Sequence, residues 1–124
     1  APALTNVAFR AISPYLNVPA GARRVRVSPT GTQTTVIDAP VTLVGSTAYT
    51  VIATGRAAGA NAGIQPLVLT DDNTAPAAGQ VRVRVVHAAA LVPNVDVYVS
   101  GPNDALPATP TVANLAFRAA TPTY

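Results

Sequence analysis

Two short runs between Val81 and Gly101 place an apolar residue at every second position, and this alternation restricts the fold more than any other feature of the sequence. The runs read VRVRVV and VDVYVS, and Pro93 and Asn94 supply the turn between them. A period of two residues gives a strand one apolar face and one polar face. The alternation therefore predicts two β-strands that each bury one face.

The rest of the chain repeats this pattern of short apolar runs broken by Pro and Gly. The stretch from Arg23 to Ala39 predicts a hairpin that turns at Pro29 to Gly31. Ile64 to Thr70 predicts a strand at a sheet edge, because Pro66 cannot donate a backbone hydrogen bond. We expect an all-β, immunoglobulin-like β-sandwich of about seven to nine short antiparallel strands.

The composition excludes some covalent crosslinks and makes a membrane-spanning helix unexpected. The chain has no Cys, no Met and no Lys, and its formal net charge of +3 comes from Arg and Asp alone. Disulfides and Lys–Asn isopeptide bonds are therefore excluded as crosslinks. No apolar run approaches the roughly 18 residues of a membrane helix, so we expect no membrane span.

Four arginines fall on the outward faces of predicted strands: Arg24, Arg26, Arg82 and Arg84. A basic surface of this kind raises the question of nucleic-acid binding. Neither lysines nor aromatic residues are interleaved with these arginines, so a stacking platform for bases is lacking. We expect the arginines to pair with aspartates or to limit edge aggregation, and we expect no nucleic-acid partner.

Candidate residues for catalysis or metal binding are few. His87 is the only histidine, and Asp96 is the acidic residue that could join it as a base or half of a metal site. Because no second His, Cys or Glu exists to complete a ligand set, a hydrogen-bonded structural histidine is the preferred interpretation. Asp71, Asp72 and Asn73 are interpreted as a turn in preference to a calcium loop. We expect no catalytic residue, no cofactor, no metal site and no enzymatic activity.

Part of the chain resembles a known family. The motif VRVVHA, a short Pro-containing linker and the motif NVDVYVSG span Val83 to Gly101. They resemble the opening of the domain of unknown function 4397 family, found in tandem in secreted and surface proteins of bacteria and archaea. The resemblance continues through Leu115 to Tyr124, and it covers nearly the whole chain in rotated order. The family usually has a Ser-Pro-Asp-like linker after the histidine, where this chain has Ala88 to Val92.

The resemblance implies how the chain is organised. Residues 1–70 correspond to the C-terminal half of a family domain, residues 71–80 to a linker, and residues 81–124 to the N-terminal half of the next domain. The linker, DDNTAPAAGQ, has turn-forming residues and no periodic apolar face. Together the two halves make one domain period plus a duplicated strand.

One segment occurs twice, near the two ends of the chain. ALTNVAFRAISPY, Ala3 to Tyr15, matches TVANLAFRAATPTY, Thr111 to Tyr124. A single sandwich needs one copy, and a surplus strand beside a vacant edge invites pairing with another chain. We expect the subunit interface for strand exchange to consist of the matched residues of the two copies, which are Asn6, Val7, Phe9 and Arg10 in the first and Asn114, Leu115, Phe117 and Arg118 in the second.

Two functions follow from these observations. The first is a structural subunit of an extracellular filament or surface assembly, a homopolymer that grows head-to-tail because a strand or half-domain of one subunit completes the sheet of the next. The second is a secreted adhesin, or a module that binds a carbohydrate or protein ligand, acting through the loops Gly55 to Gly63 and Pro102 to Pro110. An alternative to polymerisation is that the chain spans the middle of a two-domain protein, or folds as a permuted monomer with a frayed end.

The start of the sequence bears on its location. Ala1, Pro2 and Ala3 are small residues of the kind that remain after signal-peptide cleavage, and the chain has no Met. We therefore expect an exported protein at the cell surface or outside the cell. A fragment cut from a longer tandem protein would look the same.

Overall fold

The computed structural model describes residues 2–59 and 63–122. The middle of the predicted loop Gly55 to Gly63 lies outside the described residues, as do Ala1 and the end of the second repeat, Thr123 and Tyr124. Among the described residues there is no helix, and six short strands form three two-stranded antiparallel sheets. The all-β prediction is confirmed, whereas the two facing layers of a sandwich stay a prediction.

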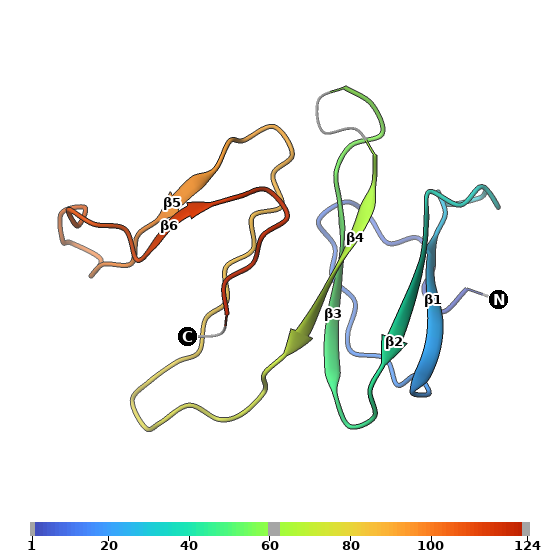
Figure 1. Ribbon diagram of the computed structural model, residues 1–124, viewed down its shortest axis with the longest axis horizontal. Helices are drawn as coiled ribbons and strands as arrows, with labels where there is room; N and C mark the ends of the chain where they lie inside the picture. Colours follow the sequence, from blue (N-terminus) through green and yellow to red (C-terminus); the bar gives the residue numbers. More distant parts are fainter. Residues whose placement is uncertain (1, 60–62, 123–124) are drawn as a thin grey trace. The chain divides into compact units, whose positions relative to one another are not determined.

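The chain divides into two compact units, Ala1–Thr47 and Ala48–Tyr124, and each is described by itself. The first unit contains one pair of strands and the second unit contains two pairs (Figure 1). The pairs are β1 (Gly21–Val27) with β2 (Ile37–Leu43), β3 (Ala48–Thr54) with β4 (Gln65–Asp71), and β5 (Val95–Val97) with β6 (Val112–Leu115).

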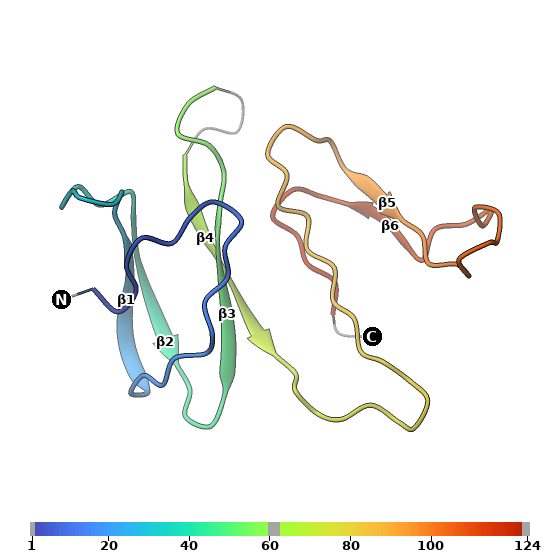
Figure 2. The same cartoon turned by 180° about the vertical axis from the view of Figure 1, so that it is seen from behind.

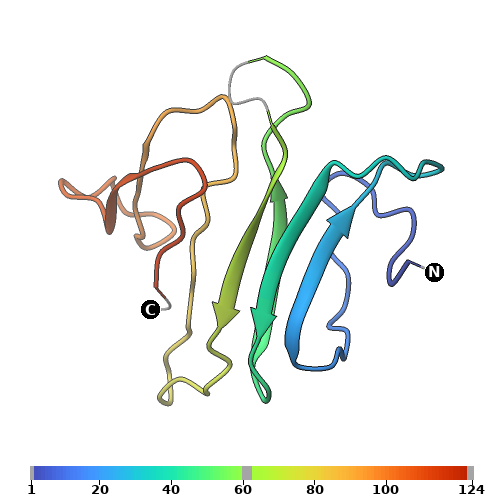
Figure 3. The same cartoon turned by 45° about the vertical axis from the view of Figure 1, so that its right-hand side comes forward.

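The hairpin of the first unit forms where the sequence predicts it. β1 and β2 pair along their whole length, and Figure 3 shows the two strands running in opposite directions. In the loop between them, the Thr32 N–H donates to the Pro29 carbonyl (3.0 Å), which closes a turn at the predicted place. Ile37, the first residue of β2, is buried. Val27 and Val25 are more exposed than a fully inward face would require.

Asp38 of β2 interacts with two arginines of β1. Its Oδ1 lies 2.8 Å from Nε of Arg24 and 3.5 Å from Nε of Arg26. The hydrogen bond from Arg24 lowers the pKa of Asp38 below its ordinary value of 3.8. All three side chains are exposed, so these ion pairs contribute little to stability, but opposite charges across the strands favour the observed register.

In the second unit, β3 and β4 form a regular antiparallel ladder. Thr54, at the end of β3, is buried, and its hydroxyl donates to the carbonyl of Gln65 (2.9 Å). Pro66 lies opposite Ala53. Among the described residues, β3 is the one strand that pairs with β4, which agrees with the edge position predicted from Pro66.

The first of the two strands predicted between Val81 and Gly101 does not form. Residues 81–85 are outside any strand, and Val86 makes a single bridge to Ala120. The predicted burial of one face also fails here, because Val81 is 78% exposed and Val83 is 51% exposed. A strand needs a second backbone along its length as well as an alternating sequence. Here a second backbone lies beside residues 85–87 only. The second predicted strand forms as the short β5.

Side chains hold the stretch where that strand was expected. Nη1 of Arg82 lies 2.7 Å from Oδ2 of Asp72, and Nη2 of Arg84 lies 2.5 Å from Oδ1 of Asp71. Arg84 also donates to the carbonyl of Thr70 (2.8 Å). The expectation that outward arginines pair with aspartates is confirmed at these two positions.

The alternation of Val7 and Phe9 with Ala8 and Arg10 also predicts a strand, and this prediction is wrong. Asn6 and Arg10 have φ angles of 55° and 70°, which lie in the left-handed region and cannot continue an extended strand. The Ala11 N–H donates to the Ala8 carbonyl (3.0 Å) and closes a turn that contains Arg10. Figure 2 shows this N-terminal part of the first unit as a chain without strand arrows.

Replacing Arg24 with Gln raises the pKa of Asp38 toward its ordinary value, because the strongest partner of the carboxylate is removed. Since the folded-state pKa is depressed, the ion pair stabilises the hairpin at neutral pH, and this contribution is lost as the pH falls through the folded-state pKa. An NMR titration of the Asp38 carboxyl carbon measures the change. Arg23→Gln is the control, because Arg23 donates to backbone carbonyls only. An unchanged titration in Arg24→Gln contradicts the assignment.

Candidate subunit interface

The second copy of the repeated segment, residues 111–122 of the described chain, docks onto the stretch around His87. β6 pairs with β5, with Leu115 opposite Val95. The chain then turns back so that Ala120 bridges to Val86, and Figure 1 shows this red segment beside the yellow one. The second copy therefore has a backbone partner at both of its ends.

Backbone hydrogen bonds fix this docking at residues 85–87. The Arg118 N–H donates to the His87 carbonyl (2.7 Å), and the His87 N–H donates to the Ala119 carbonyl (3.0 Å). The Thr121 N–H donates to the Val85 carbonyl (2.9 Å), and the Thr121 hydroxyl accepts the Val85 N–H (3.0 Å). Thr121 is buried, so these bonds are shielded from water.

Leu115 and Asn114 hold the other end of the second copy. The Leu115 side chain is 8% exposed and is one of two buried apolar side chains in the described residues. The Asn114 N–H donates to Oδ1 of Asp96 (2.7 Å), and the Asn114 side chain accepts from Asn94 (2.9 Å). Asp96 thus anchors the second copy, a role that differs from the pairing with His87 considered from the sequence.

His87 has the contacts of a structural histidine. The side chain is 5% exposed, and its Nδ1 accepts the Ala89 N–H (3.3 Å). The ring proton is therefore on Nε2, which donates to the Pro93 carbonyl (3.0 Å). The Phe117 ring meets the imidazole edge-on, with 6.1 Å between the centroids. Both ring nitrogens are engaged, so the contacts favour the structural interpretation over a base or a metal ligand.

Arg118 connects the second copy to β3 and β4. Its Nε donates to the Thr54 hydroxyl (3.0 Å), and its Nη2 donates to the Gly63 carbonyl (2.9 Å). The guanidinium carbon lies 4.6 Å from the centroid of the Phe117 ring, in the geometry of a cation–π contact. Residues 85–87, β5, Thr54 and Gly63 together form what we call the docking site.

The first copy has the same backbone conformation as the second. Asn6 and Asn114 have φ angles of 55° and 57°, and Arg10 and Arg118 have φ angles of 70° and 67°. The turn in the first copy is closed by Ala11 donating to Ala8 (3.0 Å), and the matching turn in the second copy is closed by Ala119 donating to Ala116 (2.9 Å). Left-handed backbone at Arg is uncommon. Its recurrence at both matched positions indicates that the two copies are the same structural motif.

The first copy differs from the second in what covers it. Val7 is 53% exposed, and Phe9 and Ile12 are each 93% exposed. The matched residues of the second copy are Leu115, which is buried, and Phe117 and Ala120, which are partly buried. An apolar segment that has adopted its docked backbone but has no cover is the kind of surface that binds another chain.

The acidic turn predicted between the two halves has its carboxylates engaged. Asp72 accepts the Thr74 N–H (3.0 Å). The Thr74 hydroxyl, followed by this N–H and the charge of Arg82, lowers the pKa of Asp72. Asp71 accepts from Thr50 (2.8 Å) and from Arg84. Among residues 2–59 and 63–122, no group of three His or Asp side chains is placed to hold a metal ion.

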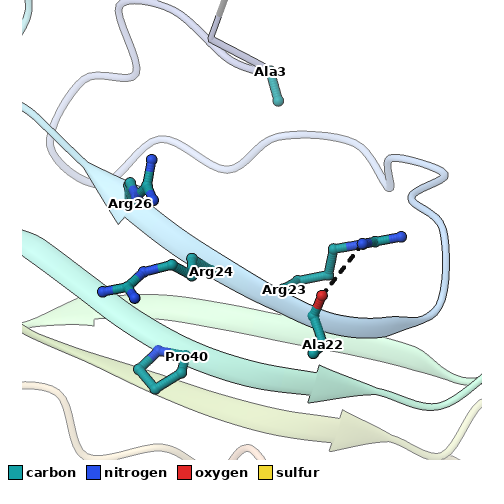
Figure 4. Close-up of a pocket in the computed structure, with 6 residues that line it drawn as sticks. All are labelled: Ala3, Ala22, Arg23, Arg24, Arg26 and Pro40. Carbon is teal, nitrogen blue, oxygen red and sulfur yellow. Dashed lines mark hydrogen bonds between the residues drawn. The ribbon is translucent and has the colours of Figure 1, made fainter.

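An open hollow of about 690 Å³ lies beside β1 in the first unit (Figure 4). Arg23 donates from three nitrogens to the carbonyls of Pro19, Ala20 and Ala22. Arg24 and Arg26 share Asp38. The hollow is lined by Ala3, Ala22, Arg23, Arg24, Arg26 and Pro40. Because these guanidinium groups have partners within the chain, the hollow adds no second candidate site.

These features define a small all-β domain in which a repeated segment docks onto strand residues far away in the sequence. The family model described as "Domain of unknown function (DUF4397)" matches residues 1–98, and the chain belongs to this family. The matched residues include the first copy and end before the second copy. No curated protein and no solved structure matches the chain. In the described part of the chain, no helix is suited to crossing a membrane.

Replacing Arg118 with Ala destabilises the second unit by roughly 2 to 4 kcal/mol, because two hydrogen bonds and a cation–π contact are lost. Arg10→Ala is the matched control, since Arg10 is the equivalent residue of the exposed first copy. We expect this variant to change stability by less than about 0.5 kcal/mol. Urea unfolding measures both values, and hydrogen exchange at the His87 and Arg118 amides locates the effect. Equal losses in both variants contradict the assignment of docked and undocked copies.

Replacing Gly55 with Ala displaces Arg118. Gly55 has a φ of +105°, and a Cβ there would overlap the Gly63 carbonyl and crowd Nη2 of Arg118. We expect a loss of roughly 2 to 4 kcal/mol together with faster exchange of the Arg118 amide. Gly79→Ala is the control, because Gly79 has a φ of +76° and open space around it. A Gly55→Ala protein as stable as Gly79→Ala would show that this close approach is unimportant.

Proposed function

We propose that this chain is an exported structural subunit of an extracellular filament or surface assembly, built head-to-tail through exchange of a strand or half-domain. One observation carries the proposal. Two copies of one segment share a backbone conformation, and one is docked while the other exposes Phe9 and Ile12. A chain that exposes an apolar segment with the backbone conformation of a docked segment is suited to bind the docking site of another copy of itself.

The position of the two copies supports an open polymer over a closed oligomer. The first copy lies near the N-terminus and the docking site lies in the second unit. A contact between the first copy of one subunit and the docking site of another joins two different surfaces, so it is heterologous. Heterologous contacts that do not close into a ring generate filaments.

The proposal also fits what holds the chain together. No Cys is present, and the chain has no Lys, so disulfides and Lys–Asn isopeptide bonds cannot lock a fibre. A joint that buries a whole segment with its backbone hydrogen bonds dissociates slowly and supplies durability by itself. The alternative function, ligand binding through loops, has less support, because residues 102–110 contain no aromatic residue and the fully exposed phenylalanine is Phe9 of the first copy.

Negative-stain electron microscopy of the native protein, together with a denaturing gel of boiled and unboiled samples, tests this function. We expect filaments, and a ladder on the gel that collapses only on boiling, because strand-exchanged joints resist detergent more than surface contacts do. Compact particles of uniform size at all concentrations would contradict the proposal. That outcome would direct attention to ligands of residues 102–110.

A further inference from the structure

We infer that the first copy of one subunit replaces the second copy of another at the docking site, so that the second copy is an internal occupant that keeps dilute subunits monomeric. The exchange concerns the joint of the proposed filament and therefore rests on that function. It adds the identity of the exchanging segments and the condition under which they exchange.

The first copy carries the groups that the docking site binds. With the same backbone, Asn6 presents its N–H where Asn114 donates to Asp96. Arg10 presents its guanidinium where Arg118 donates to Thr54 and Gly63. Each hydrogen bond that the second copy makes through these residues therefore has an equivalent donor or acceptor group in the first copy.

The polar end of the segment matches as well. Ser13 stands at the position of Thr121 in the repeat, and the hydroxyl of Thr121 accepts the Val85 N–H. Serine keeps that hydroxyl acceptor. Phe9 likewise keeps the aromatic ring that Phe117 places against His87.

Each chain has one docking site and two copies, so exchange exposes one copy as it covers another. The balance therefore depends on the positions where the copies differ. The copies differ at four positions that are buried or half-buried in the second copy, where Ile12 stands for Ala120, Leu4 for Val112, Val7 for Leu115 and Ser13 for Thr121. The first two replacements add three carbon atoms and one carbon atom, and the last two each remove one, so the first copy has a net gain of two. At roughly fourfold in affinity per buried methylene, the first copy is favoured on the order of tenfold.

The internal occupant has a different advantage, because it belongs to the same chain as the docking site. A short tether gives an effective concentration of about 1 mM. A tenfold preference for the first copy overcomes this tether once subunits reach about 0.1 mM. Dilute subunits therefore stay monomeric. Subunits at high local concentration, such as those just exported at the cell surface, exchange and polymerise.

Pairs of introduced cysteines test the exchange, and the chain has no other Cys. Val86 and Ala120 face each other at a bridge flanked by hydrogen bonds from His87 to Ala119 and from Thr121 to Val85. Such non-hydrogen-bonded pairs have close Cβ atoms, which suits a disulfide. Val86→Cys with Ala120→Cys should therefore crosslink within a chain. Val86→Cys with Ile12→Cys should crosslink between chains.

Three results are expected from the oxidised proteins at concentrations from 1 μM to 1 mM, a range set around the estimated threshold. Wild-type protein assembles only at the upper end of the range. The V86C/A120C variant stays monomeric until a reducing agent frees its second copy. The V86C/I12C variant gives a ladder of disulfide-linked oligomers on a non-reducing gel, whereas the single V86C variant gives none beyond a dimer.

The outcomes separate this exchange from the function on which it rests. If wild-type protein assembles and oxidised V86C/A120C assembles equally well, the second copy stays in place during assembly. The exchange is then wrong while the filament remains. If V86C/I12C crosslinks only within its own chain, the first copy does not join subunits and the exchange is again wrong. If wild-type protein never assembles, the proposed function itself fails.

Discussion

The side chain of Arg118 is the interaction on which the second unit depends. It reaches from the repeated segment to β3 and β4, where the Thr54 hydroxyl accepts from it while donating to Gln65. The same guanidinium covers the Phe117 ring, and that ring meets His87. One arginine thus joins a sheet end, an aromatic contact and a buried histidine. These groups are far apart in the sequence, so the arrangement exists only when the second copy is docked.

Polar contacts have this importance because the apolar core is small. Ile37 and Leu115 are the buried apolar side chains of the described residues, one in each unit. Three separate two-stranded sheets cannot enclose more, since a pair of strands is marginally stable without packing against another layer. Phe9 and Ile12 remain exposed in the single chain. A chain with so little core gains more from a neighbour than a chain whose core is complete.

The sequence predicts the β1–β2 hairpin well and the repeated segment less well, for different physical reasons. Alternation and turn residues suffice for hairpins such as β1 with β2, because both partners are close in the sequence. The stretch before His87 has the same alternation, but alternation does not supply a neighbouring backbone, and Val81 and Val83 stay exposed. The left-handed backbone at Arg10 and Arg118 has almost no signal in the sequence, because arginine does not favour it. Only the preceding asparagines, which tolerate positive φ, pointed to it.

The eight residues expected at the interface are predicted from the repeat alone. The sequence does not predict Thr54, Gly63 and Asp96, which bind the second copy within the chain, because those contacts span long sequence separations. The repeat also bears on the cost of binding in the proposed exchange. Ordering a flexible segment on binding costs part of the interaction energy. The first copy already has both left-handed residues and the closed turn. Little further conformational entropy is therefore lost when it binds. In the proposed exchange, the remaining change is that Phe9 and Ile12 lose contact with water, which favours binding.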